Sequence, residues 1–320
     1  MVKTSPQIDR GEISSLLDSA LAGEKYPIAR LISYIENPLY SHQYRQLIFP
    51  LLQEKQQDVA KNLTIGITGT PGAGKSSLIG ELCHTFIKDS EQKLAIVAID
   101  PSSNVSGGSI LGDRTRVVLP TRENRIFFRS QASQLEMGGV NPYTYHVIRF
   151  LRYLFDYVII ETVGIGQNET EVTYLADFSF LVLQPLGGDQ IQFMKSGIME
   201  VPNAFIINKC DEEELAAQSY HTLSTSLSFL KDTISQELPP IFLTSTVSKK
   251  GIQELFQFLQ KLPAPHFRNQ ESKHQLQKWI VSDYGKLGLQ KVLRDFPGEF
   301  VEEMIDFESL QAKIQEHMGL

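Results

Sequence analysis

The chain has 320 residues, of which 42% are hydrophobic and 21% are charged, and its formal net charge is −7. This composition is typical of a folded globular protein, and the acidic balance does not favour nucleic acid or an anionic membrane as a partner. The two cysteines, Cys83 and Cys210, lack the spacing of a metal site or a disulfide framework, and no signal-like or membrane-spanning apolar run occurs. We expect a cytoplasmic protein.

Residues 1–58 show the apolar spacing of helices. The apolar positions are Ile13, Leu16, Leu17, Ala20, Leu21, Ile28, Leu31, Ile32 and Ile35. Gly23 should end the first helix and Asn37-Pro38 the second, and Pro50 should interrupt a third around residues 44–53. We expect a small N-terminal helical extension that packs against the main domain.

From residue 59 to 262, short β-rich runs alternate with helical ones. Strands are predicted at 63–68, 94–100, 126–129, 157–161, 178–184, 204–208 and 241–244, and helices at 75–88, 143–155, 190–199, 214–235 and 249–259. Most strands are continuous apolar runs, which is typical of parallel strands covered on both faces. The pattern predicts an α/β fold with a mostly parallel central sheet, in which ligands bind at the carboxyl ends of the strands.

Residues 263–320 return to helical spacing after Pro263-Ala264-Pro265. Apolar residues recur at Leu276, Ile280, Tyr284 and Leu287, whereas Gly285 and Gly288 argue against one uninterrupted helix. We expect a C-terminal helical appendage that serves either as a lid on the domain's own core or as a dimerisation arm.

A complete phosphate-binding loop follows the first predicted strand and precedes a predicted helix. Its glycines let backbone N–H groups converge on a phosphate, and the helix N-terminus adds partial positive charge. Lys75 would bridge the β- and γ-phosphates of a nucleotide, and the hydroxyl of Ser76 would bind Mg²⁺. The residues assigned to phosphate binding are Gly69, Gly72, Ala73, Gly74, Lys75, Ser76 and Ser77. This segment predicts a P-loop NTPase.

The segment Asn208-Lys209-Cys210-Asp211 ends another apolar strand. In this position Asp211 can accept the ring N–H and the exocyclic amine of guanine together, which adenine cannot match. Ser245, after the last strand, is the expected second contact to the base. We therefore assign base binding to Asn208, Lys209, Asp211 and Ser245, and we expect GTP and GDP as ligands.

Acidic residues follow two other strands. Glu161 begins Glu161-Thr162-Val163-Gly164, where an acid can hold Mg²⁺ and its waters and the Gly164 N–H can reach a γ-phosphate. Asp100 and Asp113 are candidates for Mg²⁺ or water positioning, so the predicted metal residues are Ser76, Asp100 and Glu161, and the predicted catalytic residues are Lys75, Asp100, Asp113 and Glu161.

Ile165 follows Gly164, in a position where a glutamine would orient the attacking water. We therefore expect slow hydrolysis by the isolated protein. The segment 185–192 after the next strand is either a mobile loop that senses the nucleotide or a plain connection.

Together these motifs resemble the MeaB/ArgK family of P-loop GTPases, the chaperones of adenosylcobalamin-dependent acyl-CoA mutases. The resemblance rests on residues 69–76, 100–103, 107–116, 161–167, 188–189 and 208–211. It implies a homodimeric GTPase that binds a methylmalonyl-CoA-type mutase, gates the loading of its cofactor and limits its inactivation. In the family, the acids that match Asp100, Asp113 and Glu161 lie at the Mg²⁺ and hydrolysis site, and the loop that matches 185–195 is a switch.

The chain departs from the family at Gln190, where a glutamate is common, at Cys210, where an alanine is common, and after Leu289. Two other functions remain open. A metallochaperone GTPase for nickel enzymes would carry a His-rich tract or a Cys-x-x-Cys, and neither occurs in the sequence. A kinase linked to amino-acid transport would need an acceptor site and an active-site base.

Overall fold

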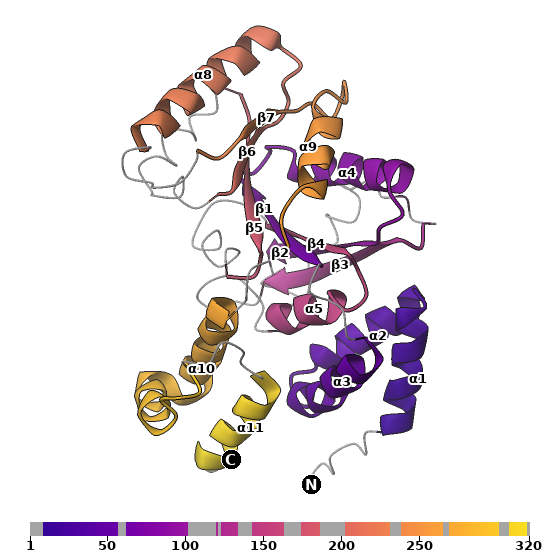
Figure 1. Ribbon diagram of the computed structural model, residues 1–320, viewed down its shortest axis with the longest axis vertical. Helices are drawn as coiled ribbons and strands as arrows, with labels where there is room; N and C mark the ends of the chain where they lie inside the picture. The colour runs from indigo at the N-terminus through magenta and orange to yellow at the C-terminus, as the bar shows by residue number, and fades with distance from the viewer. Residues whose placement is uncertain are drawn as a thin grey trace. The chain divides into compact units, whose positions relative to one another are not determined.

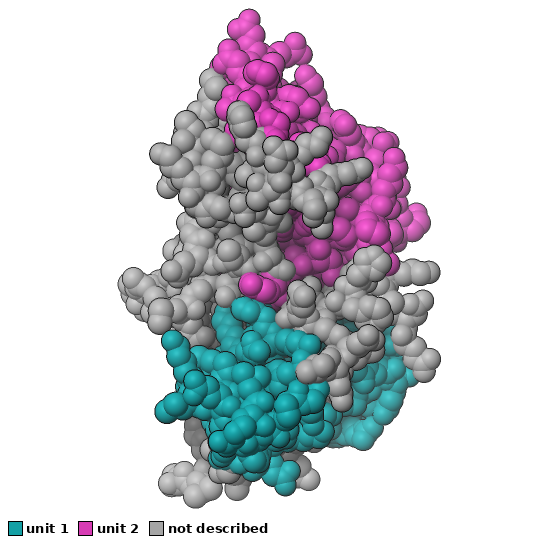
Figure 2. Space-filling view, turned by 60° about the vertical axis from the view of Figure 1, so that its left-hand side comes forward, with its two compact units in different colours: residues 1–61, 142–154, 265–320 teal, residues 62–141, 155–264 magenta. Residues whose placement is uncertain are grey.

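The chain packs as two compact units, which Figure 2 shows in two colours. The first comprises residues 1–61, 142–154 and 265–320, and the second comprises residues 62–141 and 155–264. The computed structural model describes residues 9–56, 62–101, 120, 123–133, 143–162, 174–185, 202–230, 238–264, 269–300 and 307–318. No helix within these ranges is long and apolar enough to cross a bilayer.

The second unit is built on a seven-stranded sheet in the order β3-β2-β4-β1-β5-β6-β7 (Figure 1). The strands are β1 (Leu63–Gly69), β2 (Leu94–Pro101), β3 (Ile126–Ser133), β4 (Tyr157–Thr162), β5 (Phe178–Leu183), β6 (Ala204–Ile207) and β7 (Ile241–Leu243). All pairings between these described strands are parallel. The predicted α/β class with a mostly parallel sheet is confirmed.

Helices cover both faces of this sheet, which explains why its strands are apolar throughout. On one face, α4 (Lys75–Asp89) and α9 (Ile252–Gln260) pack against side chains such as Ile65 and Val182. On the other, α8 (Glu213–Leu230) packs against Leu181 and its neighbours. Because successive side chains of a strand point to opposite faces, Leu181 and Val182 belong to different layers of the core.

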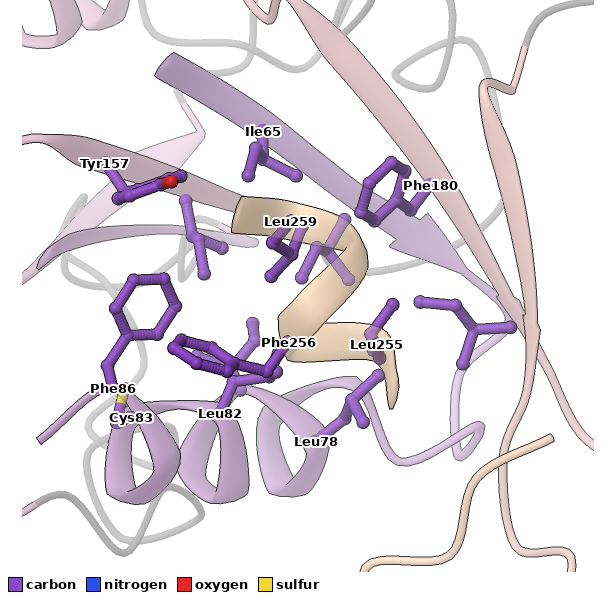
Figure 3. Packing of buried hydrophobic residues seen from close by; sticks show 14 of the residues in the cluster. Ile65, Leu78, Leu82, Cys83, Phe86, Tyr157, Phe180, Leu255, Phe256 and Leu259 are labelled. Atoms are coloured by element: carbon purple, nitrogen blue, oxygen red, sulfur yellow. The ribbon is translucent and has the colours of Figure 1, made fainter. Parts of the chain in front are cut away.

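Figure 3 shows the centre of the first of these layers. Phe86 of α4 meets Tyr157 of β4 and Phe256 of α9 edge-on, with ring centroids 5.1 and 5.0 Å apart. Such edge-to-face pairs add to the free energy gained from burying the rings. The cluster fixes α4, and with it the loop that precedes α4, against the sheet.

The helix predicted at 190–199 lies outside the described residues, and the others differ from prediction mainly at their ends. The helix expected at 249–259 begins at Ile252, because Gly251 has a φ of 72° and starts the helix from a left-handed conformation. A Cβ at Gly251 would lie 2.0 Å from the carbonyl oxygen of Leu243. Only glycine therefore fits between β7 and α9.

The first unit is helical and gathers three separate segments of the chain. Its helices are α1 (Arg10–Leu21), α2 (Lys25–Ile35), α3 (Ser41–Lys55), α5 (Thr144–Leu151), α10 (Asn269–Asp295) and α11 (Phe307–Met318). The prediction that Pro50 interrupts the third helix was wrong, since α3 runs through it. Phe49, Leu51 and Leu52 around it are buried, and their packing outweighs the roughly 3 kcal/mol that a proline costs a helix.

The prediction that the C-terminal helix is interrupted is confirmed at Gly285. This residue has φ 70° and ψ 179° and breaks α10 into two helical pieces. Leu276 and Ile280 before the break and Val292 after it are buried in one cluster with the apolar face of α11. The break thus lets both pieces of α10 contribute to one core.

A buried group of charged residues joins α3, α5 and α11. Arg149 donates two hydrogen bonds of 2.8 Å to the two carboxylate oxygens of Glu308. Arg45 donates to Gln311 Oε1 at 2.9 Å and meets His146 Nε2 at 2.7 Å. Arg149 also lies over the ring of Phe49, 4.2 Å from its centroid. Arg45 Nη1 also lies 3.6 Å from Glu308 Oε1, so one carboxylate links residues of α3, α5 and α11 that are far apart in the sequence.

Burial governs the protonation of this group. It lowers the pKa of Arg45 to about 10 and holds the pKa of His146 well below its usual 6.5, with the charges of Arg45 and Arg149 acting on His146 in the same direction. Burial also acts to lower the pKa of Arg149, but the charge and hydrogen bonds of Glu308, together with Tyr145 and Tyr153, raise the value overall. His146 is therefore a neutral acceptor for Arg45 at neutral pH.

Replacing Glu308 with glutamine should destabilise the first unit by about 3–5 kcal/mol, because the buried Arg45 and the partly buried Arg149 lose the carboxylate that they share. The matched control is Arg10→Gln, which removes an exposed pair with Glu54 at 3.7 Å and should cost no more than about 1 kcal/mol. Urea denaturation followed by the fluorescence of Trp279, the single tryptophan, reports this unit. Equal costs for the two variants would contradict the role given to Glu308.

The first unit should also lose stability in mild acid. The pKa of His146 is lower in the folded protein than its usual value of 6.5, so the unfolded chain takes up the proton first and stability falls as the pH drops below about 6.5. The expected slope is about 1.4 kcal/mol per pH unit. His146→Gln should flatten it in denaturation curves measured from pH 7.5 to 5, leaving the smaller contribution of His42, whose pKa burial also lowers.

Candidate nucleotide-binding site

The loop between β1 and α4 has the backbone shape that its glycines predict. Gly69, Gly72 and Gly74 have φ values of 142°, 80° and 85°, a region that side chains disfavour. A Cβ at Gly69 would lie 2.0 Å from the carbonyl oxygen of Val182, and one at Gly74 would lie 2.5 Å from Asn208 Nδ2. The loop is therefore pressed against β5 and the base motif, and its turns require glycine.

Lys75 lies over this loop in the first turn of α4. Its side chain is buried, and Nζ donates to the carbonyl oxygens of Gly69 at 2.8 Å and Thr70 at 3.0 Å. The ammonium group and the N-terminus of α4 thus place positive charge on the same side of the loop. This arrangement suits the phosphates of a nucleotide.

Ser76 and Glu161 meet across the boundary between β1 and β4. Ser76 Oγ donates to Glu161 Oε1 at 2.5 Å, and Glu161 is 8% exposed. A hydroxyl and a carboxylate are hard oxygen ligands of the kind that Mg²⁺ takes, so the donor set fits this ion. Ser76 and Glu161 would hold Mg²⁺, which when bound neutralises charge on the phosphates.

Asn208 connects the base motif to the phosphate loop. Its Nδ2 donates to the carbonyl oxygen of Ala73 at 2.9 Å, and its Oδ1 accepts from Thr244 Oγ1 at 3.1 Å. Asn208 is fully buried. Its role is therefore to hold β6, β7 and the loop in one arrangement, and the sequence did not indicate Thr244 as its partner.

Asp211 and Ser245 lie together at the other end of the site. Ser245 Oγ donates to Asp211 Oδ1 at 2.5 Å and accepts from the backbone N–H groups of Val247 and Ser248 at 3.2 and 3.0 Å. The exposed carboxylate is thus oriented by a serine that is itself held in place. An ionised carboxylate keeps further acceptor capacity for a base. Direct contact between Ser245 and the base stays a prediction.

The two residues before Asp211, Lys209 and Cys210, contact other parts of the protein. Lys209 has a φ of 63°, and its Nζ lies 3.5 Å from Gln184 Oε1. Cys210 is buried, and its thiol donates to the carbonyl oxygen of Ile207 at 3.1 Å. Burial raises the pKa of the thiols of Cys210 and Cys83, the latter to about 12. Both cysteines are protonated packing residues.

The structure brings most of the predicted residues to the carboxyl edge of the sheet. Lys75, Ser76 and Glu161 form one end of the site, and Asn208, Asp211 and Ser245 form the other. Asp100 lies near the end of β2, but its side chain, Asp113, Gly164 and Gln190 lie outside the described residues. Their predicted roles are not tested by the structure.

Comparison with known proteins shows the family to which the chain belongs. Residues 28–286 match the family described as "Methylmalonyl Co-A mutase-associated GTPase MeaB". The chain belongs to the MeaB family. It is 35% identical over 254 residues to a putative GTPase of Pyrococcus abyssi, covering 76% of this chain and 74% of that one. It is also 35% identical over 238 residues to GTPase ArgK of Escherichia coli, covering 73% and 71%.

A third relative is the "Methylmalonic aciduria type A homolog, mitochondrial" of Caenorhabditis elegans, 29% identical over 288 residues, or 85% of this chain and 72% of that one. A crystal structure described as "LAO/AO transport system kinase" shares the fold, with a TM-score of 0.64 and 21% identity over 98% of this chain and 99% of that one. The resemblance drawn from the motifs is therefore confirmed. The chain is a P-loop GTPase that binds guanine nucleotide.

Changing Asp211 to asparagine should weaken GTP binding by at least tenfold and leave weak ATP binding unchanged, because the amide replaces an acceptor with a donor opposite the guanine amine. The same variant should gain affinity for xanthosine triphosphate, whose base carries an oxygen at that position. Equilibrium titration with fluorescent derivatives of the three nucleotides measures this. Parallel losses for GTP and ATP would show that Asp211 does not read the base.

Proposed function

We propose that this GTPase is a chaperone of an adenosylcobalamin-dependent acyl-CoA mutase of the methylmalonyl-CoA type. The observation that carries the proposal is a nucleotide site with both a phosphate end and a guanine end, in a chain of the MeaB family. The family description and the name of the Caenorhabditis elegans relative, which refers to methylmalonic aciduria, support the choice of partner. GTP hydrolysis would gate cofactor loading and limit inactivation of the mutase.

Each residue of the site has a proposed part in this reaction. Lys75 neutralises the β- and γ-phosphates, Ser76 and Glu161 hold Mg²⁺, and Asp211 selects guanine. We assign Mg²⁺ or water positioning to Asp100 and Asp113, and a contact with the γ-phosphate to the Gly164 N–H. The short contact between Ser76 and Glu161 supports the metal assignment, because both oxygens already converge on one point.

The site lacks a glutamine at the position that orients the attacking water in other GTPases. Ile165 follows Gly164, and its aliphatic side chain makes no hydrogen bond to water. We propose that the partner supplies or completes the water-positioning group, so that the isolated protein hydrolyses GTP slowly. Hydrolysis then acts as a timer for the complex.

The remaining parts of the proposal concern assembly. We propose that the protein acts in the cytoplasm as a homodimer, with residues 263–320 as the dimerisation arm and residues 185–195 as a switch that reports to the mutase. Two apolar side chains of α10 are exposed, Leu287 at 80% and Val281 at 37%. They support the assignment of residues 263–320 as the dimerisation arm.

The proposal is tested by measuring GTP and ATP turnover with and without a purified adenosylcobalamin-dependent mutase. We expect slow GTP turnover that the mutase stimulates by at least tenfold, and negligible ATP turnover. An acyl-CoA mutase of the same class denatured by heat serves as the control protein. Phosphate transferred to a protein acceptor would favour a kinase, and stimulation by a nickel enzyme precursor alone would favour a metallochaperone.

Two variants test the residue roles within the same assay. Lys75→Ala should abolish nucleotide binding, because the phosphates lose their buried cation, whereas Glu161→Ala should retain nucleotide and hydrolyse it at least tenfold more slowly. Binding is measured by calorimetry and turnover by phosphate release. Equal loss of binding in both variants would contradict the separate roles.

A further inference from the structure

The sheet has a seam between β1 and β4, and the nucleotide site straddles it. The last registered pair across the seam is Ile67 with Glu161. Each of the two strands also pairs on its other side: β1 pairs with β5 from Ile65 to Gly69, and β4 pairs with β2 from Tyr157 to Thr162. The β1–β4 boundary thus lies between the strands β3-β2-β4 and the strands β1-β5-β6-β7 of one continuous sheet.

The two residues of the candidate metal site, Ser76 and Glu161, lie on opposite sides of this seam. Glu161 belongs to the β4 half, whereas Ser76 follows β1 through the phosphate loop. Their hydrogen bond of 2.5 Å crosses the seam. A small separation of β1 from β4 would change this distance directly.

One side-chain hydrogen bond spans the seam one residue beyond this pair. Thr162 Oγ1 donates to Thr68 Oγ1 at 3.0 Å, and the two residues are 1% and 4% exposed. Thr162 directly follows Glu161, and Thr68 directly precedes Gly69 of the loop. Because side chains alternate along a strand, this pair lies on the face opposite Glu161 and cannot reach the nucleotide side itself.

We propose that Thr68 and Thr162 are positioning residues for GTP hydrolysis, which act by holding the seam so that Glu161 stays opposite Ser76. This inference rests on the role proposed for Glu161. The hydroxyl pair lies one residue beyond Ile67 and Glu161, at the end of β4. Loosening it moves the carboxylate relative to the loop without removing any group that touches nucleotide.

The simpler interpretation is that two buried hydroxyls only satisfy each other. The two interpretations differ in their response to valine, which has the shape of threonine without the hydroxyl. A single valine leaves one buried hydroxyl without its partner and costs stability, whereas replacing both removes the unmet hydrogen bond and is nearly neutral. If the pair serves stability alone, the double variant should recover both stability and activity.

The test compares Thr68→Val, Thr162→Val, the double variant and Thr162→Ser. Thr64→Val is the matched control, because Thr64 is buried on the same face of β1 at its other end and its hydroxyl has no hydrogen-bond partner among the described residues. Three quantities are measured in each protein: the melting temperature, kcat and KM for GTP, and the rate at which GDP leaves when Mg²⁺ is chelated.

We expect each single valine variant to melt a few degrees below the wild type and the double variant to melt close to it. All three should show kcat lowered about tenfold with KM little changed, since the loop that binds phosphate is intact. The acceleration of GDP release by chelation should shrink in the same variants, which reports the metal side of the site without turnover. Thr162→Ser and Thr64→Val should match the wild type in kcat.

A second comparison asks whether the pair acts through Glu161. In a Glu161→Gln background, adding the double valine change should lower kcat no further, because a positioning effect vanishes with the group that is positioned. Wild-type kcat in the double valine variant, or a further tenfold loss in the Glu161→Gln background, would overturn this inference alone. A wild-type rate in Glu161→Gln itself would refute the role of Glu161 as well.

Discussion

The parallel pairing of β1 with β4 is the constraint on which the site depends. It places Ile67 beside Glu161 and so brings the carboxylate of one strand within 2.5 Å of the Ser76 hydroxyl that follows the other. Parallel strands carry all their carboxyl ends to one edge, and the burial of both faces of these strands fixes their register. The packing of Phe86 against Tyr157 supplies this cover on the α4 side. The geometry of the candidate site is therefore a consequence of core packing.

A second constraint links the two ends of the candidate site, the phosphate loop and the base motif. Asn208 donates to the carbonyl oxygen of Ala73, and Gly74 leaves no room for a side chain beside it. The base motif and the phosphate loop are thereby fixed to one another at a single buried contact. The fold therefore sets the separation between Asp211 and Lys75, and with it the spacing between the two ends of the candidate site.

The sequence was sufficient for the features that short segments encode. Continuous apolar runs predicted all seven strands, and the glycines around Lys75 predicted the loop, because both patterns arise from local backbone requirements. A local sequence pattern does not indicate which distant residue will pair with a buried charge. Arg149 and Glu308 are separated by 159 residues, and nothing in either neighbourhood points to the other. The same holds for Thr68 and Thr162, whose hydroxyls meet only because β1 and β4 are neighbours.

The path of the chain shows why the helical unit is not a detachable accessory. Residues 142–154 lie between β3 and β4 in the sequence, but they belong to the first unit. Arg149 within that segment is fixed by Glu308, and Asp156 just beyond it is fixed in the second unit, where its carboxylate accepts the Lys93 N–H at 2.7 Å. Removing residues 263–320 would take away Glu308 and Gln311, the partners of Arg149 and Arg45 in this unit. The strand that carries Glu161 begins directly after this connection, so the chain passes from the helical unit straight into β4.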